Sequence, residues 1–289
     1  LMSIEIIENK VSNLLHDQIS HISKMFLEKY KQNTEAMFEL SKKVINGRSY
    51  IDRINIRYYK EVMQNTKEVI EFMNILNIVP NVNINLEKLL NNIEDLDFKT
   101  VRAVTIGCDL RRDWEKSRIK FWIEVDNNPG FMYKILNKYG YTEEMLNMIF
   151  SYSLCFGINY NMDGSTTVKN HIYSYNIKRN KMLQLKLSPF FSEPVVEALS
   201  KADFMFLGYR KKNQKKFIYY FTHLNNIKMI INTLRIDNIT DDMLLLDDIR
   251  PYGFGCYSDQ ITESKNQISE FNLYYNVSKH CNQLIPKNG

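Results

Sequence analysis

The sequence predicts an α+β fold in which about ten antiparallel strands close into a barrel inside a ring of α-helices. Apolar or alternating segments pair into hairpins, and each hairpin is followed by a helical pattern. The first strands of four such units begin near residues 101, 152, 203 and 253, at steps of 51, 51 and 50 residues. A sheet of this size is expected to curl, and closure removes its exposed edges; an open sheet under one layer of helices is the alternative.

The order of elements follows from periodicity and turn residues. Hairpins are expected at 36–59, 101–125, 152–177, 203–223 and 253–276. Helices are expected at about 3–33, 60–76, 86–93, 131–137, 143–150, 194–201 and 227–234. The dipeptides Asn46-Gly47 and Asp163-Gly164 favour tight hairpin turns. The sequence therefore predicts a single domain over 1–289, with an N-terminal helix and five strand–strand–helix repeats over about 36–279.

Composition narrows the class of protein. Hydrophobic residues make up 44% and charged residues 25%, as in globular proteins, and the net charge of +5 suits an anionic ligand but is too small to favour nucleic acid. The four cysteines have no metal-binding or disulfide spacing. No apolar run approaches the ~20 residues of a membrane span, and no signal peptide is apparent. We expect a cytoplasmic monomer with no metal-ligating residues and no nucleic-acid or membrane partner.

The hairpin over 101–125 predicts a polar barrel interior. Its second strand alternates strictly, so Arg118, Lys120, Trp122 and Glu124 share one face while apolar residues share the other. If helices cover the apolar face, two cations and an aromatic ring point inward, and the next hairpin adds Lys169. Buried cations need partners, and a diphosphate satisfies several of them at once. Aromatic faces stabilise a cation, so this interior suits the transfer of an allylic cation.

Several motifs resemble the cyanobactin-type (RiPP) peptide prenyltransferases, members of the ABBA or prenyltransferase-barrel family. One match is GCDLRRDWEKSRIKFWIEV at 107–125, with a Gly-x-Asp-Leu-Arg turn and a lysine-bearing strand. The others are FELSKKV at 38–44, DGSTTVKNHIYSY at 163–175, FMFLGYRK at 204–211, KFIYYFTHL at 216–224 and NLYYNVSK at 272–279. Each motif is weak alone, but the motifs occur in colinear order, one per repeat. The resemblance implies the ABBA barrel.

The resemblance also implies an activity and a set of site residues. The activity is transfer of a prenyl group from an allylic diphosphate to a side chain of a ribosomally made peptide, with Mg²⁺ bound through the diphosphate. Glu39 matches the carboxylate that takes the proton of the acceptor. The diphosphate-binding residues implied are Arg53, Arg118, Lys120, Lys169, Tyr173, Tyr219 and Tyr274. The prenyl pocket or acceptor site is implied at Trp122, Phe204, Met205, Phe206 and His223.

Some features depart from the family or leave alternatives open. Asn272 stands where several relatives carry an arginine, and Arg57 competes with Arg53 for the second-strand position. The bulky residues 204–206 favour dimethylallyl diphosphate over geranyl diphosphate as donor. The acceptor stays open among tyrosine, tryptophan, histidine, arginine and the chain termini. A barrel prenyltransferase for a free small aromatic, and a non-catalytic barrel that binds nucleic acid or another ligand, are the alternative functions.

Overall fold

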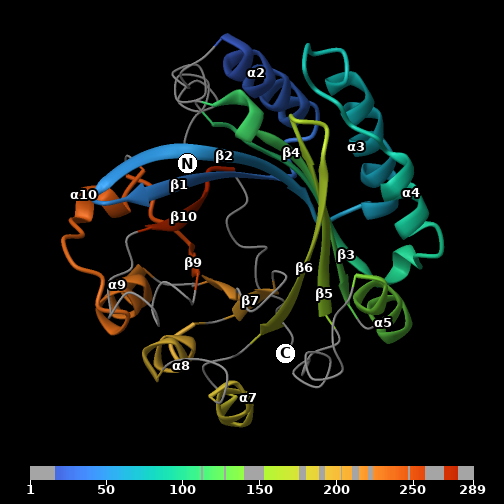
Figure 1. Ribbon diagram of the computed structural model, residues 1–289. Helices are drawn as coiled ribbons and strands as arrows, with labels where there is room; N and C mark the ends of the chain where they lie inside the picture. The colour runs from blue at the N-terminus through green and yellow to red at the C-terminus, as the bar shows by residue number, and fades with distance from the viewer. Residues whose placement is uncertain are drawn as a thin grey trace.

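The computed structural model shows an antiparallel barrel with its helices outside (Figure 1). It describes residues 17–111, 113–126, 128–139, 153–175, 180–188, 193–202, 204–209, 215–220, 224–246, 248–257 and 270–278. Over 170–175, 204–209 and 215–220 this description extends to the backbone only. The predicted α+β class with antiparallel strands is confirmed.

The strands of the described residues are joined edge to edge in the order β1-β10-β9-β8-β7-β6-β5-β4-β3-β2, and β2 pairs again with β1, which makes a closed barrel. Their bounds are β1 Met37–Ile45, β2 Arg48–Tyr58, β3 Val101–Asp109, β4 Arg118–Asp126, β5 Ser153–Asn161, β6 Thr166–Tyr175, β7 Phe204–Tyr209, β8 Lys215–Tyr220, β9 Gly253–Tyr257 and β10 Glu270–Asn276. Pairing is long between β4 and β5 and short between β9 and β10, where it spans residues 253–255 and 272–274.

The helices follow the hairpins on the outer side of the sheet (Figure 1). Their bounds are α2 Asp17–Gln32, α3 Val62–Leu76, α4 Glu87–Ile93, α5 Pro129–Lys138, α7 Lys181–Leu187, α8 Glu193–Leu199, α9 Leu224–Thr233 and α10 Asp241–Leu244. The first predicted helix is described from Asp17 onward, and the one predicted over 143–150 lies outside the described residues. The short helix α7 was not predicted. No helix among the described residues is long and apolar enough to cross a membrane.

The hydrophobic core lies between the sheet and the helices. Phe38, Phe121 and Phe156 are fully buried on the outer face of the barrel, in one cluster with Phe72 and Leu76 of α3. Burial of side chains of this size contributes about 1.5–3 kcal/mol each to folding. Because apolar side chains fill the outer face, period-2 alternation directs the polar set of each strand into the barrel.

Two backbone features position that polar set. Asn46 and Gly47 both have positive φ, 48° and 74°, which is the conformation that a two-residue hairpin loop requires, and the predicted turn between β1 and β2 is confirmed. Between Ser41 and Lys42 the register shifts, so that Asp52 of β2 is an extra residue opposite β1. A β-bulge of this kind re-aims side chains. The adjacent residues Asp52 and Arg53 are consequently both buried.

Candidate active site inside the barrel

Paired residues on neighbouring strands bring the polar side chains together in rows that run across the sheet. One row is Tyr274, Ser41, Arg53, Asp109 and Arg118, from β10, β1, β2, β3 and β4. The next is Asn276, Glu39, Asn55, Gly107, Lys120 and Asn159, from β10 to β5. The third is Met37, Arg57, Thr105, Trp122, Gly157 and Lys169, from β1 to β6. We call them the Arg53 row, the Glu39 row and the Trp122 row.

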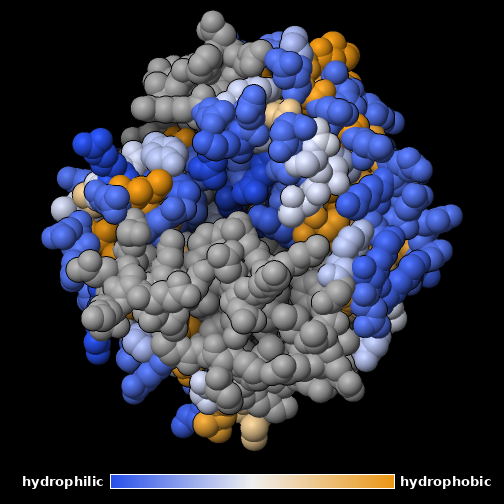
Figure 2. Space-filling model, viewed as in Figure 1, coloured by the Kyte–Doolittle hydropathy of each residue, from blue (hydrophilic) through white to orange (hydrophobic). Residues whose placement is uncertain are grey.

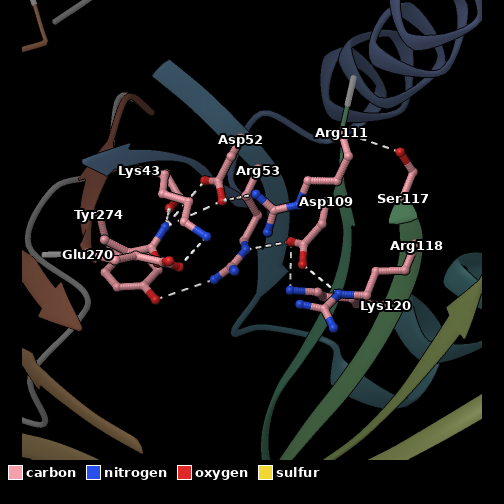
Figure 3. A network of polar contacts seen from close by, with 12 residues as sticks. Lys43, Asp52, Arg53, Asp109, Arg111, Ser117, Arg118, Lys120, Glu270 and Tyr274 are labelled. Atoms are coloured by element: carbon pink, nitrogen blue, oxygen red, sulfur yellow. Dashed lines mark hydrogen bonds and ion pairs between the residues drawn. The ribbon is translucent and has the colours of Figure 1, made fainter. Parts of the chain in front are cut away.

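The carboxylate of Asp109 is the centre of the Arg53 row (Figure 3). Its Oδ1 accepts a hydrogen bond from Arg53 Nε at 2.6 Å and lies 2.6 Å from Lys120 Nζ. Its Oδ2 accepts from Arg118 Nε, also at 2.6 Å. Asp109 is fully buried and Lys120 is 5% exposed. One carboxylate therefore holds three cations whose stems come from β2 and β4.

The pKa values of Asp109 and Lys120 are shifted by their burial and by the surrounding charges. Burial alone would raise the pKa of Asp109, but the attraction of Arg53, Lys120 and Arg118 outweighs it and holds that pKa well below its ordinary value. Burial, together with repulsion from Arg53 and Arg118, lowers the pKa of Lys120 below its ordinary value even though Asp109 acts in the opposite direction. Burial first, and the neighbouring arginines second, thus disfavour the charged form of Lys120, and a bound anion would favour it.

A second carboxylate, Asp52, lies beside this cluster (Figure 3). Arg111 Nη1 approaches Asp52 Oδ2 at 3.1 Å, and Asn272 Nδ2 lies 3.4 Å from each oxygen of the same carboxylate. The backbone N–H of Arg111 donates to Ser117 Oγ at 2.9 Å, which fixes the turn between β3 and β4. Among the described residues, the linked clusters of Asp109 and Asp52 hold four cations against two acids.

Tyr274 faces the same interior from β10. Arg53 Nη1 donates to its hydroxyl oxygen at 3.3 Å, and the guanidinium carbon lies 5.8 Å from the ring centroid. Burial raises the pKa of Tyr274, so its hydroxyl stays protonated and remains a donor. The residues of the other parity on β10, Phe271, Leu273 and Tyr275, face away from the interior, since the Tyr275 hydroxyl donates to the carbonyl of Leu244 outside the barrel.

Glu39 lies in the next row, where an amide and a phenol bind its carboxylate. Asn55 Nδ2 donates to its Oε1 and the Tyr252 hydroxyl donates to its Oε2. Gly107 follows Asn55 in the row, and a Cβ added at Gly107 would collide with Asn55 Oδ1. The absence of a side chain at Gly107 therefore leaves the room in which Asn55 orients the carboxylate. Glu39 itself is 4% exposed.

The Trp122 row supplies an aromatic surface. A Cβ added at Gly157 would collide with ring atoms of Trp122, so the indole lies across β5 at the position of that glycine. Lys169 of β6 pairs with Gly157 on its other side and acts electrostatically on Lys120. The predicted face of β4 is confirmed, since Trp122 and Lys120 both point into the barrel interior.

Arg57 belongs to a separate cluster on the Trp122 row. Its Nη2 lies 3.1 Å from Glu124 Oε1 and its Nε donates to Thr105 Oγ1 at 3.2 Å. Arg57 therefore has a carboxylate partner of its own, away from Asp109. Between the two candidates on the second strand, the structure places Arg53, not Arg57, with Lys120.

The predicted site residues divide into three groups. Arg53, Arg118, Lys120 and Tyr274 meet in one network, and Glu39, Trp122 and Lys169 lie on the two adjoining rows. Strand positions are described for Tyr173, Phe204, Met205, Phe206 and Tyr219, but their side chains are not, and His223 lies outside the described residues.

The prediction from sequence missed Asp109, Asp52 and Asn55. Asp109 is part of the motif at 107–125. Its position next to the charged turn was the signal that could have identified it as a site residue. The inward cations were expected to have a diphosphate as their shared partner. In the structure Asp109 already pairs with three of them. Asn272, at the position where relatives carry arginine, bonds to Ser41 and Asp52 instead of adding a further cation.

The site was also considered as a metal centre. Within the described part of the chain, no group of three His, Cys, Asp or Glu side chains could hold a metal ion. Both oxygens of Asp109 are already bound by cations. The described residues around Asp109 therefore do not form a metal site. Figure 2 shows strongly hydrophilic residues along the described side of a hollow near the middle of the face seen in Figure 1.

Comparisons with known proteins agree with this fold. Residues 21–277 match the model of a family described as a family of unknown function, DUF5838. No curated protein matches the chain. Among solved structures, the crystal structure of NotF prenyltransferase is similar, with a TM-score of 0.55 over 91% of this chain and 89% of that one, at 10% sequence identity. At that identity the likeness concerns the fold.

Proposed function

Because the chain belongs to the DUF5838 family of unknown function, its activity must be inferred from its site, and we propose that it is a peptide prenyltransferase of the cyanobactin type. It would transfer a dimethylallyl group, or a geranyl group, from an allylic diphosphate to a side chain of a ribosomally made peptide. The shared fold with NotF prenyltransferase supports transfer of a prenyl group. The motifs that resemble the peptide enzymes support the peptide acceptor.

The observation that carries the proposal is the excess of cations, two of them buried and one partly exposed, beside an aromatic ring. Arg53, Arg118 and Lys120 share one carboxylate, and Trp122 lies two residues along β4 from Lys120. Buried positive charge without enough acid is costly, and a bound diphosphate removes that cost through charge-assisted hydrogen bonds. The indole face two residues away suits the cationic end of the same donor.

The three rows divide the reaction among them. The bond between C1 of the prenyl group and the diphosphate oxygen breaks, and its electron pair stays on the diphosphate, where the cations of the Arg53 row and Lys120 stabilise it. The face of Trp122 stabilises the allylic cation until the acceptor atom bonds to C1. Glu39 takes the proton that the acceptor loses, and Asn55 and Tyr252 hold its carboxylate in place.

Magnesium enters this proposal only with the donor. The described residues offer no set of ligands for it, and Mg²⁺ often binds through substrate phosphates with few protein ligands. When bound, it neutralises charge on the diphosphate. Phe204, Met205 and Phe206 are predicted to line the prenyl pocket, and their bulk favours the dimethylallyl donor over the geranyl donor.

Incubation of the full chain with each donor, Mg²⁺ and a peptide panel, read by mass spectrometry, tests the proposal. A gain of one prenyl unit on a peptide supports it. A gain only on free tryptophan or phenols would assign a small-aromatic prenyltransferase. No transfer and no binding of either donor, combined with salt-sensitive RNA binding, would overturn it in favour of a binding protein.

A further inference from the structure

Asn159 is a buried amide that the fold leaves without a hydrogen bond. Its side chain is fully buried, and neither Nδ2 nor Oδ1 has a partner among the described residues. Buried polar groups are normally paired, because water is lost on burial and must be replaced. An unpaired amide at this depth therefore calls for an explanation.

Two other buried amides, Asn92 and Asn65, show the usual behaviour, whereas Asn276 leaves its Nδ2 unpaired within the described part of the chain but uses its Oδ1. Asn92 donates to the carbonyl of Lys88 and accepts from Lys138 Nζ, both within 2.8 Å. Asn65 donates to the carbonyl of Lys60 at 2.8 Å. These amides bond to other parts of the fold, whereas the side chain of Asn159 has no such hydrogen bond among the described residues.

The neighbours of Asn159 are those expected at a binding site for an anion. It pairs with Lys120 across β4 and β5, in the Glu39 row, so the two side chains point to the same side of the sheet. Arg118 and Trp122, two residues either side of Lys120, are its diagonal neighbours on β4. On β6 it pairs with Thr167, which makes Lys169 a diagonal neighbour as well.

We propose that Asn159 binds the prenyl donor, by donating from its amide to a diphosphate oxygen beside the C1–O bond. The inference rests on the proposed function. Asn159 lies opposite Lys120 and diagonal to Trp122, so it adjoins both the group that would bind the diphosphate end of the donor and the indole that would face its prenyl end. As C1–O breaks, the electron pair moves to the diphosphate, and the hydrogen bond from Asn159 stabilises the added charge on it.

The same strand offers a matched control. Asn161 faces the same side two residues along β5, but its amide donates to Ser165 Oγ at 2.9 Å and Thr167 Oγ1 at 3.3 Å within the hairpin. Its hydrogen bonds are satisfied without a ligand. Replacement of Asn161 therefore changes a surface amide of the same type without removing an unpaired donor.

The test measures binding of inorganic pyrophosphate and of dimethylallyl thiolodiphosphate to the full chain by titration calorimetry, with the melting temperature of the ligand-free protein as a second readout. The variants are Asn159→Leu, Asn159→Ala, Asn161→Ala and Lys120→Met. Both Asn159 variants should weaken binding about tenfold, the value of one hydrogen bond to a charged group. The ligand-free melting temperature of Asn159→Leu, which keeps the side-chain volume, should be unchanged or higher, because an unpaired polar group has been removed.

Each outcome decides something. Wild-type affinity in a folded Asn159 variant, with loss in Lys120→Met, would overturn this inference and leave the proposed function intact. A lower melting temperature in both Asn159 variants would show a structural role and would also overturn it. Equal weakening in Asn161→Ala would make the effect non-specific. If the wild-type chain binds neither ligand, the proposed function fails together with the inference.

Discussion

Glu39 and Lys120 lie in one row of paired residues across the barrel wall, with Asn55 of β2 and Gly107 of β3 between them. Neighbouring strands are spaced at about 4.8 Å, so roughly 14 Å of sheet separates the two backbones. The wall curves, and both side chains point inward, so they face each other across a shorter gap. A carboxylate and an ammonium group held apart by the wall can act on two ends of one substrate complex.

Replacement of Lys120 tests the diphosphate end. Lys120→Met should weaken binding of the donor by about 10- to 100-fold, since one charge-assisted contact is lost, while the melting temperature changes little or rises. Lys120→Arg, which keeps the charge, is the control and should retain more affinity. Pyrophosphate binding measured by calorimetry checks this. Wild-type affinity in Lys120→Met would remove Lys120 from the site.

Replacement of Glu39 tests the acceptor end. Glu39→Gln keeps the shape and can still bond to Tyr252, but it cannot take a proton. Turnover should fall by about 10²- to 10⁴-fold, with donor affinity within a few-fold of wild type. Wild-type turnover in Glu39→Gln would contradict a general base at Glu39.

Removal of the charge of Asp109 should destabilise the fold. Asp109→Asn leaves the buried Arg53 and Lys120 and the partly exposed Arg118 without their carboxylate, at a cost of about 3–5 kcal/mol. Because the folded state lowers the pKa of Asp109, its stabilising effect is present above the ordinary value of 3.8 and is lost as pH falls toward the lowered one. Wild type should therefore lose its advantage over Asp109→Asn in acid, as measured by urea unfolding at several pH values.

Pyrophosphate provides the control for this variant, because it can replace the missing negative charge. It should raise the melting temperature of Asp109→Asn by more than that of wild type. An equal or smaller rise would mean that Asp109 positions the cations for phosphate and does not merely neutralise them.

The indole platform predicts a collision at Gly157. Gly157→Ala places a methyl group where the Trp122 ring lies, and overpacking of this kind costs about 1–3 kcal/mol. The double variant Gly157→Ala/Trp122→Ala removes the collision and should lose less stability than the sum of the two single changes. Urea unfolding of all four proteins gives the coupling energy, and strictly additive effects would contradict the packing of Trp122 on Gly157.

Lys120 also predicts proton uptake on binding. Its pKa is lowered by burial and by Arg53, and a bound diphosphate favours its charged form. Donor affinity should therefore fall as pH rises above the lowered pKa of ligand-free Lys120. Binding should take up a proton at pH values between that pKa and the higher pKa of Lys120 in the complex. Calorimetry of pyrophosphate binding in buffers of different ionisation enthalpy measures the uptake, and Lys120→Arg corrects for protons released by pyrophosphate itself. Equal proton exchange in the two proteins would contradict a neutral fraction of Lys120.

The sequence was sufficient to predict the antiparallel architecture and part of the candidate site. Strict alternation on β4 predicted which side chains enter the barrel, because a one-residue shift would turn its apolar face inward. On β10 alternation was ambiguous, since aromatic residues occupy both parities, and only the pairing of Tyr274 with Ser41 resolves it.

Asp52 and Asp109 show why the remainder was missed. Regular alternation places Asp52 and Arg53 on opposite faces, and only the bulge in the pairing with β1 buries both. Asp109 adjoins a charged turn, so it looked like part of a solvated loop, although it is the last residue of β3. Both depend on contacts between strands far apart in sequence, which local patterns do not contain.

The shared carboxylate at position 109 has an evolutionary consequence. A relative that replaces this acid by a neutral residue would carry three mutually repelling side chains in its interior, so at least one of positions 53, 118 and 120 should change with it. An alignment of the family in which 109 varies independently of those three would mean that the charge balance inside the wall is set elsewhere.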